Sequence, residues 1–589
     1  MAETRRPRNA CARVVGVLAL AITCLMVAAC GSIPTNSSPQ PITSFERKGP
    51  TNAVPVPQSD MDPESLVRAF LKATADPAGG HRAARSFLTP TASSRWDDRG
   101  DTLVLDDINV FVDQRSEDAV RLRLSGDNVG LVRSGGQLLP ATGRVETTMS
   151  LVRVGDQWRI DGPLPAGTTI DRSQFDAAYR AVTLYFTDRN RTRLVADPRW
   201  LYGREQTDPT TLVDRLIRGP SSDLDPAVDS AFPNGAALRG PVITGGGGGG
   251  GVRIELTGIG NLSERDRATL AAQIIWTLDG AEIGGPYIIN ADGAPLIAER
   301  ASGWQTADVK AADPNSGPST DVGLNVIRDG ALSSVTDTGT APVGGPLGAG
   351  KDLRAATISA DGRRVASVTA RTGPGPRLRL AVGDYGGAIA EIVTGDSITR
   401  PSFGADANTV WAVADGRPVQ WVRDADGSGE RVATVDAAAV APVAPGPITE
   451  LQIAPDGVRA AMIVGGQVVF AVVSTNAEGR VSLTDARIAA YNIGNRAVSL
   501  DWASPTTVMI ARSAPDSPVV ALSINGTPAV GLLSGNVSPP VRAVVANAST
   551  IYVGDARGIL RLGSSNGQPD QYWTEVEPAM APGVIPVLP

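Results

Sequence analysis

A repeat in the second half of the chain limits the fold more than any other feature of the sequence. Five segments match when each is aligned on one residue, and successive segments lie 43 to 50 residues apart. A second small or apolar residue follows six or seven positions later, after a tight turn at Asp-Gly or its equivalent. The aligned pairs are Ile358 and Val365, Phe403 and Val410, Ile453 and Ala460, Trp502 and Val508, and Val545 and Ile551. Each segment therefore predicts two short strands joined by a turn.

Short strands that recur every 40 to 50 residues or so are typical of β-propeller blades. One blade cannot bury both of its faces, so neighbouring blades stack and the ring closes on itself. Residues near Val322–Val335 predict one further blade, which gives five or six, or more if a blade is degenerate. The regular spacing favours a propeller over a β-sandwich, which is the structural alternative. We therefore predict an all-β propeller over residues 301–589.

The first thirty residues have the pattern of a lipoprotein signal. Arginines precede an apolar stretch, Val14–Ala29, which suits a signal-peptide core but is short for a membrane span. The stretch ends in Val27-Ala28-Ala29-Cys30, which resembles a lipobox. We predict a signal peptide over residues 1–29 and lipidation of Cys30 as an N-palmitoyl, S-diacylglycerol cysteine, which anchors the chain to the extracytoplasmic face of the plasma membrane. The alternatives are an uncleaved membrane span and an ordinary signal with a chance cysteine.

Cysteine usage and charge narrow the remaining possibilities. The three cysteines, Cys11, Cys24 and Cys30, lie in or directly after this signal, so no disulfide is expected in the folded part. The whole chain has a formal net charge of −7, and residues 1–29 carry four arginines and one glutamate, which leaves −10 for the remainder. Such a chain is not expected to bind nucleic acid through bulk attraction. Residues 30–60 are rich in Pro, Ser, Thr and Asn, and we predict a flexible tether after the lipidated cysteine.

Residues 61–172 predict a small α+β domain. Asp62-Pro63-Glu64 is a good helix start, and a second short helix is expected around Arg82–Phe87. The expected strands are 103–105, 110–112, 120–124, and a hairpin of 149–154 with 158–160 around Gly155-Asp156. Helices followed by antiparallel strands resemble the cone-shaped folds of the nuclear-transport-factor-2-like (NTF2-like) group. This resemblance concerns architecture and says little about activity.

Residues 173–300 predict a second α+β unit. The expected elements are a strand at 182–186 paired with 194–195, a helix at 210–218, a strand at 252–256, a long helix capped by Ser263 and a strand at 287–290. Phe232-Pro233-Asn234-Gly235 lies between the two halves. This order resembles the GerMN domain, which occurs in sporulation and cell-envelope proteins.

Two glycine motifs in this unit have the spacing of nucleotide-binding loops only in part. Gly258-Ile259-Gly260 lies between a strand and a helix, but the sixth position of the fingerprint is Ser263 and no ribose-binding acid follows at the usual offset. The run Gly245–Gly251 lacks the Gly-Lys-Ser/Thr ending of a phosphate loop and is interpreted as a long mobile hairpin loop. No cofactor is therefore predicted.

A lipobox, a small α+β domain, a GerMN domain and a C-terminal propeller, in this order, resemble the LpqB lipoproteins of actinobacteria over nearly the whole chain. The resemblance implies a regulatory role. Members of the family associate with the extracytoplasmic domain of the sensor histidine kinase of the MtrA–MtrB two-component system, and they influence cell-envelope homeostasis and cell division. It implies an MtrB-like kinase and the plasma membrane as partners, with the cell wall as a further candidate, and it assigns no interface residues.

The sequence predicts no catalytic or metal-binding residues and a protein that is not an enzyme. His81 is the single histidine and is expected to be a surface or helix-cap residue. Gly563-Ser564-Ser565-Asn566-Gly567 matches a nucleophile elbow but has no histidine after it, so we expect a turn. Asp424 and Asp426 resemble the start of a calcium loop, but Glu430 comes too early, so an interblade turn is expected. A glycosidase needs only two carboxylates, and that alternative stays open.

A cell-wall glycan- or peptide-binding lipoprotein is the other alternative function. Tryptophan is a common sugar-stacking residue, and its burial therefore bears on this alternative. Trp276, Trp411 and Trp502 lie in apolar patterns and are expected in the core, whereas Trp304 and Trp573 flank the propeller and are less clearly buried.

Overall fold

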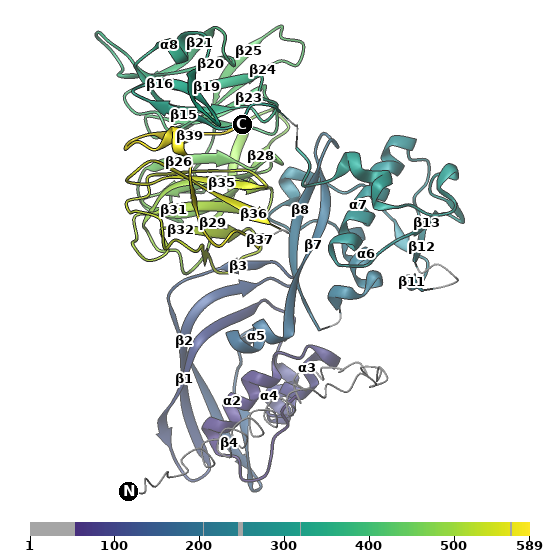
Figure 1. Cartoon of the computed structure of the whole chain (residues 1–589). Helices are drawn as coiled ribbons and strands as arrows, with labels where there is room; N and C mark the ends of the chain where they lie inside the picture. The colour runs from purple at the N-terminus through teal and green to yellow at the C-terminus, as the bar shows by residue number, and fades with distance from the viewer. Residues whose placement is uncertain (1–53, 204, 246–250, 318–319, 566–567) are drawn as a thin grey trace, which may run out of the picture. The chain divides into compact units, whose positions relative to one another are not determined.

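The computed structural model describes residues 54–203, 205–245, 251–317, 320–565 and 568–589. The predicted signal peptide, Cys30 and most of the predicted tether lie outside these residues. Within them, no helix combines the length and the apolar character needed to cross a membrane. The described chain contains an α+β region, a second α+β region and a region of six small sheets, in that order (Figure 1).

The first region is a sheet covered by short helices. The helices are α2 (Pro63–Ala73), α3 (Ala78–Arg85) and α4 (Pro90–Arg95). The strands are β1 (Thr102–Arg115), β2 (Ala119–Val132), β3 (Leu138–Pro140), β4 (Arg144–Val154), β5 (Gln157–Asp161) and β6 (Thr168–Asp171). The sheet order is β5-β4-β2-β1-β6, with β3 paired to β2. The apolar face of α2 packs with Phe87 and Trp96 against Leu105, Leu122 and Leu151 of the sheet, which confirms the predicted α+β domain.

Three details of this region differ from the sequence prediction. Residues 103–105 and 110–112 belong to one strand, β1, whose register shifts between Asp106 and Asn109. The helix expected at Arg82–Phe87 lies earlier, at Ala78–Arg85, and Phe87 is a core residue beyond its end. Helix α4 was not predicted, although Thr89 caps it by accepting a hydrogen bond from the Ala92 backbone N–H at 3.1 Å.

The second region contains two sheets around one hydrophobic core. Its helices are α5 (Arg172–Ala178), which leads into it, α6 (Pro209–Arg218) and α7 (Glu264–Gly280). Its strands are β7 (Tyr179–Asp188), β8 (Leu194–Tyr202), β9 (Val228–Asp229), β10 (Ala237–Leu238), β11 (Ile243–Thr244), β12 (Val252–Thr257), β13 (Tyr287–Ala291) and β14 (Ala294–Pro295). The sheets have the orders β8-β7-β9 and β10-β12-β13-β14, with β11 on β12. Helix α7 begins after Ser263, whose side chain accepts a hydrogen bond from the Asp266 N–H, as the sequence predicts.

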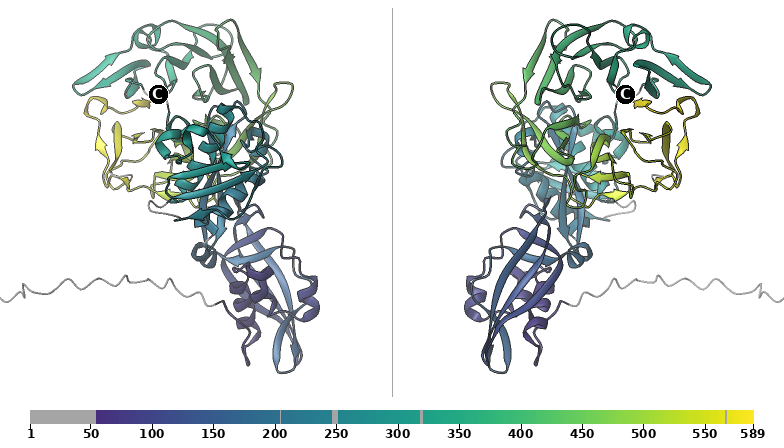
Figure 2. Two further views of the ribbon diagram at one scale, coloured as in Figure 1. Left: turned by 90° about the vertical axis from the view of Figure 1, so that its right-hand side faces the viewer. Right: turned by 90° about the vertical axis from the view of Figure 1, so that its left-hand side faces the viewer.

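The propeller consists of six sheets in the described residues. Blade 1 is β39 (Ile585–Val587), β15 (Asn325–Arg328), β16 (Ala331–Thr336) and β17 (Gly339–Pro342); blade 2 is β18 (Leu353–Ile358), β19 (Arg364–Ala370), β20 (Leu378–Asp384) and β21 (Ile389–Gly395); blade 3 is β22 (Ser402–Phe403), β23 (Thr409–Ala414), β24 (Arg417–Arg423) and β25 (Glu430–Thr434). Blade 4 is β26 (Ile448–Ile453), β27 (Arg459–Val464), β28 (Gln467–Thr475) and β29 (Val481–Ile488); blade 5 is β30 (Ala497–Ser504), β31 (Thr507–Arg512), β32 (Val519–Ser523) and β33 (Val530–Gly531); blade 6 is β34 (Ala543–Ala546), β35 (Thr550–Gly554), β36 (Ile559–Ser565) and β37 (Gln568–Pro569), with β38 (Thr574–Glu575) also on β36. Figure 2 shows the blades arranged in a ring.

The strand pairing confirms the sequence repeat. Each aligned pair in blades 2 to 5 lies directly opposite across a β-hairpin, as Ile358 does with Val365 and Trp502 with Val508. In blade 6 the register is offset by one, since Ile551 lies opposite Ala546. The predicted blade near Val322–Val335 is completed from the far end of the described chain, because β39 pairs with β15 and closes the ring.

The second region, called the GerMN-like region from here on, contacts the propeller through buried polar groups. The Arg459 guanidinium pairs with Asp456 at 3.0 Å and also donates to the backbone carbonyl of Ala196 on β8. The Trp200 indole N–H donates to the carbonyl oxygen of Asn525 at 2.8 Å. These contacts tie β8 to blades 4 and 5.

Candidate functional site

Six strands, one from each blade, surround a cavity in the propeller. Strands β18, β22, β26, β30, β34 and β39 each form one edge of a blade, and each contacts the next around the ring. The cavity has a volume of about 1180 Å³. Its walls include Ile358, Ser402, Gln452, Asp501, Ala546 and Leu588, one from each of these strands or the residue directly after it. Connector residues 311–317 and 322–324 and the turn residues Thr192–Leu194 also line it.

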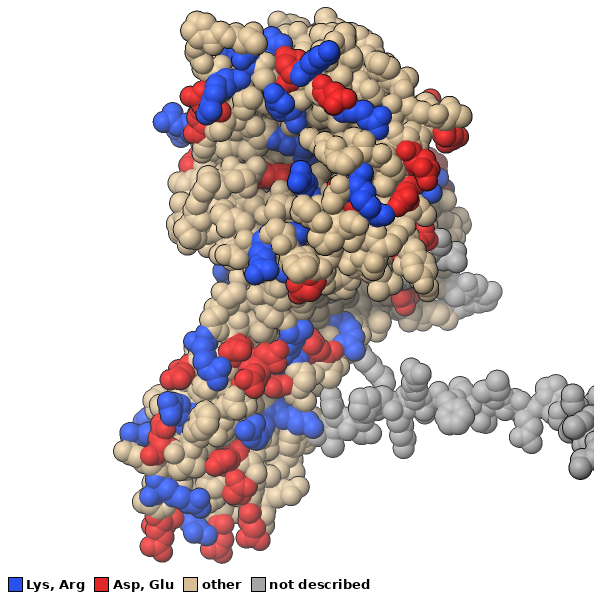
Figure 3. Space-filling model, turned by 60° about the vertical axis from the view of Figure 1, so that its left-hand side comes forward, with Lys and Arg blue, Asp and Glu red and all other residues tan. Residues whose placement is uncertain are grey.

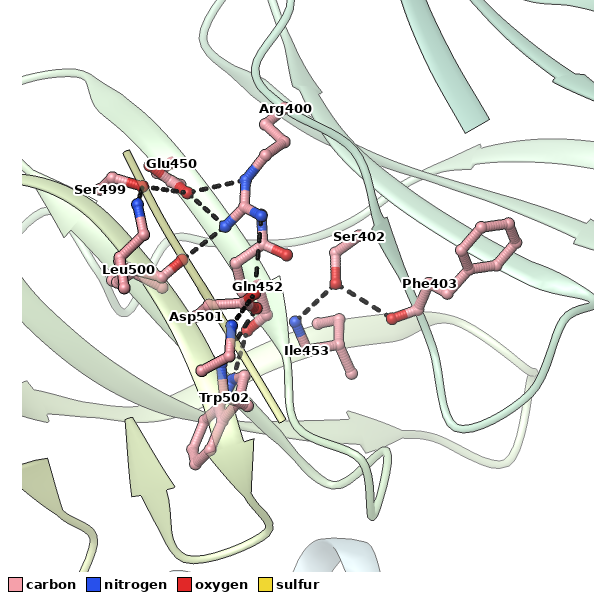
Figure 4. Close-up of polar contacts among 12 residues, drawn as sticks. Arg400, Ser402, Phe403, Glu450, Gln452, Ile453, Ser499, Leu500, Asp501 and Trp502 are labelled. Atoms are coloured by element: carbon pink, nitrogen blue, oxygen red, sulfur yellow. Dashed lines mark hydrogen bonds and ion pairs between the residues drawn. The ribbon is translucent and has the colours of Figure 1, made fainter. Parts of the chain in front are cut away.

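A buried charged cluster lies on the cavity wall (Figure 4). The Arg400 guanidinium donates to Glu450 Oε1 through Nη2 at 2.7 Å and through Nε at 3.0 Å. Its Nη1 atom lies 3.7 Å from Asp501 Oδ2. Arg400 precedes β22, Glu450 lies on β26 and Asp501 lies on β30, so one guanidinium joins three consecutive blades.

Burial determines how the cluster titrates. It raises the pKa of Glu450 and of Asp501, and the charge of Arg400 only partly opposes that rise. Burial alone would lower the pKa of Arg400, but the two carboxylates outweigh it and raise this pKa. Arg400 therefore stays charged, and the carboxylates depend on it for their ionised form.

Gln452 places a polar group on the same wall that the chain leaves unpaired. It follows Glu450 by two positions on β26, and since strand residues alternate in direction, both side chains share one face. Gln452 is only 4% exposed, and its Nε2 atom has no hydrogen-bond partner among the described residues. Such buried donors are uncommon in folded proteins, where most find a partner.

Four residues of this wall do not stand out in the sequence one by one, although the repeat contains a signal for them. They are Arg400, Glu450, Gln452 and Asp501. In blades 3, 4 and 5, the residues that lie three positions and one position before the aligned residue are all polar. They are Arg400 and Ser402, Glu450 and Gln452, and Ser499 and Asp501. Apolar residues alternate with them, so a comparison of the blades at these positions predicts a polar lining along the ring.

Comparison with known proteins determines the family. "Lipoprotein LpqB, N-terminal domain" matches residues 56–176, "Sporulation and spore germination" matches 183–297, and "Lipoprotein LpqB beta-propeller domain" matches 330–589. A lipoprotein LpqB of Mycolicibacterium smegmatis is 41% identical, covering 98% of this chain and 98% of its own length. A lipoprotein LpqB of Rhodococcus opacus is 39% identical, and the match covers 99% of this chain and 98% of the relative. This chain belongs to the LpqB lipoprotein family.

Membership of the LpqB family confirms the resemblance inferred from the order of domains. Among solved structures, a chain of the nidogen/laminin complex aligns with 45% of this LpqB-family chain and 99% of its own length. Its identity is 12% and its TM-score 0.32, which is too low to support an argument.

Cys30, the predicted lipidation site of this LpqB-family chain, lies outside the described residues. Among the described residues, no group of three or more His, Cys, Asp or Glu side chains is arranged to hold a metal ion. Acidic and basic side chains of the described part are interspersed over the face shown in Figure 3.

His81 is not the surface or cap residue that the sequence suggested. Its side chain is 12% exposed, and its Nδ1 atom lies 2.9 Å from Asp98 Oδ2. Arg85 binds the other oxygen of Asp98 at 2.8 Å, and the His81 ring lies 5.8 Å from that of Trp96. Burial alone would raise the pKa of Asp98, but the bond with His81 and the charge of Arg85 lower it. His81 therefore belongs to a cluster with Arg85, Asp98 and Trp96, which the helix pattern gave no reason to expect.

The motifs that match a nucleophile elbow and a calcium loop lie at or just beyond the ends of blade strands. Ser564 and Ser565 end strand β36, which continues toward β37 rather than into a helix; Asn566 and Gly567 are outside the described residues. Asp424 and Asp426 lie between β24 and β25, so the prediction of an interblade turn was wrong, because this hairpin lies within blade 3.

The loop Gly258-Ile259-Gly260 has its backbone donors occupied. The Asp292 carboxylate accepts the N–H groups of Gly258 at 2.8 Å, Ile259 at 3.1 Å and Gly260 at 2.9 Å. A protein carboxylate thus lies where a phosphate would bind. Of the loop Gly245–Gly251, residues 246–250 are outside the described part, and β11 and β12 pair on either side of it.

Tryptophan burial corrects one expectation. Trp411 and Trp502 are buried and Trp276 packs on the GerMN core, as predicted. Trp304 and Trp573, which we expected to be less clearly buried, are 4% and 2% exposed. Both are held by packing, and the Trp573 indole also donates to the Leu533 carbonyl at 2.7 Å.

Proposed function

We propose that this LpqB-family chain is an extracytoplasmic, membrane-anchored lipoprotein that regulates the MtrA–MtrB two-component system without catalysing a reaction. Signal peptidase removes residues 1–29, and the lipid on Cys30 holds the chain on the outer face of the plasma membrane. The folded domains contact the extracytoplasmic domain of the MtrB-like sensor kinase and thereby affect cell-envelope homeostasis and cell division. The observation that carries the proposal is the end-to-end match to LpqB lipoproteins at 38–41% identity.

Two features of the structure support a role in protein contact. The bonds of Arg459 to the Ala196 carbonyl and of Trp200 to the Asn525 carbonyl tie the GerMN-like region to the propeller, and a preorganised surface loses less entropy when a partner binds. In the propeller, Glu450 and Asp501 both face the same guanidinium, so neither is placed as an independent acid or nucleophile. That arrangement supports the non-catalytic part of the proposal.

A complementation experiment tests the anchor and the regulation together. Cells that lack their own copy receive the wild-type chain, Cys30→Ala or Cys24→Ala, and the membrane fraction and the phosphorylated fraction of the response regulator are measured. Cys24 lies in the same apolar segment but outside the lipobox, so Cys24→Ala is the matched control.

The proposal predicts that wild type and Cys24→Ala are found in membranes and restore the phosphorylated fraction, whereas Cys30→Ala loses lipid and restores little. Equal membrane retention and equal restoration by Cys30→Ala would contradict the lipid anchor. A phosphorylated fraction that no variant alters would contradict the regulatory role.

A further inference from the structure

The cavity of the propeller has the properties of a ligand site that the regulatory proposal does not use. Its volume of about 1180 Å³ is somewhat larger than the roughly 300–1,000 Å³ of typical small-molecule pockets. The Gln452 side chain lines this cavity, and its amide nitrogen is enclosed, with no hydrogen-bond partner among the described residues. A buried amide without a partner costs stability, and a ligand in the cavity recovers that cost once a flip of the amide turns the nitrogen toward it.

The charged side chains in the cavity lining itself cancel, although Arg400 also pairs with Glu450, which lies outside the lining. Two cations, Arg193 and Arg400, and two carboxylates, Asp313 and Asp501, lie in the lining. A third carboxylate, Asp456, is neutralised by Arg459 at 3.0 Å. A lining without excess charge gives no advantage to a phosphate or to a polyamine, and it suits a neutral ligand.

Neutral hydrogen-bonding side chains lie among the apolar residues of the remaining wall. They come from blades 5 and 6 and from the connector that precedes the propeller: Ser504, Thr507, Asn547, Ser549, Thr550, Asn315, Ser316 and Thr320. Hydroxyl and amide groups can both donate and accept hydrogen bonds, as can the hydroxyls of a sugar. A sugar hydroxyl also pairs with either end of the Gln452 amide, whichever faces the cavity.

We propose that this cavity binds a neutral, hydroxyl-rich saccharide, with Gln452 as the central hydrogen-bonding residue and Arg400 and Asp501 beside it. The proposal goes beyond the regulatory function, because it assigns a ligand to the propeller whether or not the chain contacts a kinase. Trp502 holds the backbone at Gln452, since its indole N–H donates to the Gln452 backbone carbonyl oxygen at 3.1 Å. Its ring is 5% exposed, so recognition here rests on hydrogen bonds rather than on stacking.

Saturation-transfer NMR with the full-length chain in a zwitterionic detergent, which contributes no sugar headgroup, tests this proposal. The probes are the neutral sugars N,N′-diacetylchitobiose, cellobiose and maltotriose, with glucosamine and glucuronate as charged comparisons. We expect at least one neutral sugar to receive saturation and the charged sugars to receive little. A Gln452→Leu variant should bind about tenfold more weakly, the change expected for one lost hydrogen bond.

Two controls separate a binding defect from a folding defect. Leucine is close to glutamine in size and removes an unpartnered amide, so the unfolding temperature of Gln452→Leu should not fall. Gln420→Leu changes the same residue type in β24, away from the cavity lining, and should bind like wild type. The proposal is overturned if no neutral sugar binds at about 10 mM, if a charged sugar binds better, or if Gln452→Leu binds as wild type does.

Discussion

At the scale of single residues, Arg400 links three blades at the centre of the propeller. Its side chain is 16% exposed and faces two carboxylates from two other blades. Removing one partner of a buried ion pair is far more costly than removing a surface charge, because the remaining charge stays buried without compensation. Arg400 is therefore both a cavity residue and a structural one.

Arg400→Ala should destabilise the chain by about 3–5 kcal/mol at neutral pH. Without the guanidinium, the folded-state pKa of Glu450 and Asp501 rises further above that of the unfolded chain. This cost is fully present above the raised folded-state pKa and is relieved as the pH falls from that value to the unfolded-state pKa, so the variant should approach wild type in acid. Calorimetric unfolding at pH 7 and pH 4 measures the difference.

Arg377→Ala is the matched control, because Arg377 pairs with Asp396 on the surface, where the two side chains are 79% and 66% exposed. Its effect should stay below about 1 kcal/mol. If Arg400→Ala changes stability no more than Arg377→Ala does, the cluster does not hold the blades together.

Asp292 stabilises the folded chain more at neutral pH than in acid, which is the opposite of the effect expected for Glu450 and Asp501 in Arg400→Ala. Its three backbone hydrogen bonds, first those from Gly260 and Gly258, lower the pKa of Asp292 below the ordinary value. The stabilisation is therefore present above the unfolded-state pKa and is lost as the pH falls through the lowered folded-state value. Asp292→Asn should unfold at a lower temperature than wild type at pH 7, and the gap should narrow near pH 3. Asp156→Asn, in an exposed turn, serves as the control; a gap that widens in acid contradicts the assignment.

At the scale of elements, Asp-Gly turns set the register of the blade hairpins. Asp329-Gly330 in blade 1 and Asp415-Gly416 in blade 3 have the same backbone: φ is 51° and 47° at the aspartates and 77° at both glycines. Two successive residues with positive φ form the turn that matches the twist of a two-residue hairpin. The two turns differ only in what surrounds them.

Gly330→Ala should destabilise the propeller more than Gly416→Ala. Both substitutions place a side chain at positive φ, which costs about 1 kcal/mol. At Gly330 an added Cβ would also lie 2.1 Å from the Lys351 carbonyl oxygen, whereas at Gly416 it meets open space. Thermal unfolding of the two variants makes the comparison, and equal unfolding temperatures would contradict the close contact of blades 1 and 2 at this turn.

These elements also show what the sequence can and cannot predict. Strands such as β18 and β19 follow from local alternation, because Ile358 and Val365 are close in the chain and pair directly. The closing strand β39 could not be placed, since its partner Asn325–Arg328 lies more than 250 residues away. The Arg400 cluster was missed for the same reason: its members are 50 residues apart and meet only when the ring forms. His81 was misjudged because its burial depends on Asp98 and Trp96, which a helix pattern does not contain.

At the scale of the whole molecule, the contacts between the GerMN-like region and the propeller decide whether the two act as one body. Arg459 is 5% exposed and bonds both to Asp456 and to the Ala196 carbonyl. Asp223 and Arg487 add a second pair across the same boundary, at 3.8 Å. A partner that binds one region would then act on both.

Arg459→Ala should separate the unfolding of these two regions. The substitution leaves Asp456 buried and unpaired and removes the bond to β8, so calorimetry should show an earlier, split transition in place of the wild-type profile. Arg480→Ala, in the same blade, removes an exposed pair with Glu478 and should leave the profile unchanged. An unaltered profile for Arg459→Ala would show that the regions are coupled in another way.

The proposed function requires that the folded domains bind the sensor kinase directly. Isothermal titration of the chain from residue 31 onward against the extracytoplasmic domain of the cognate MtrB-like kinase tests this contact, with the same domain of an unrelated sensor kinase as the control. We expect saturable binding to the cognate domain and no heat with the control. Absence of heat with the cognate domain at high concentration, or equal heat with both, would contradict direct and specific contact.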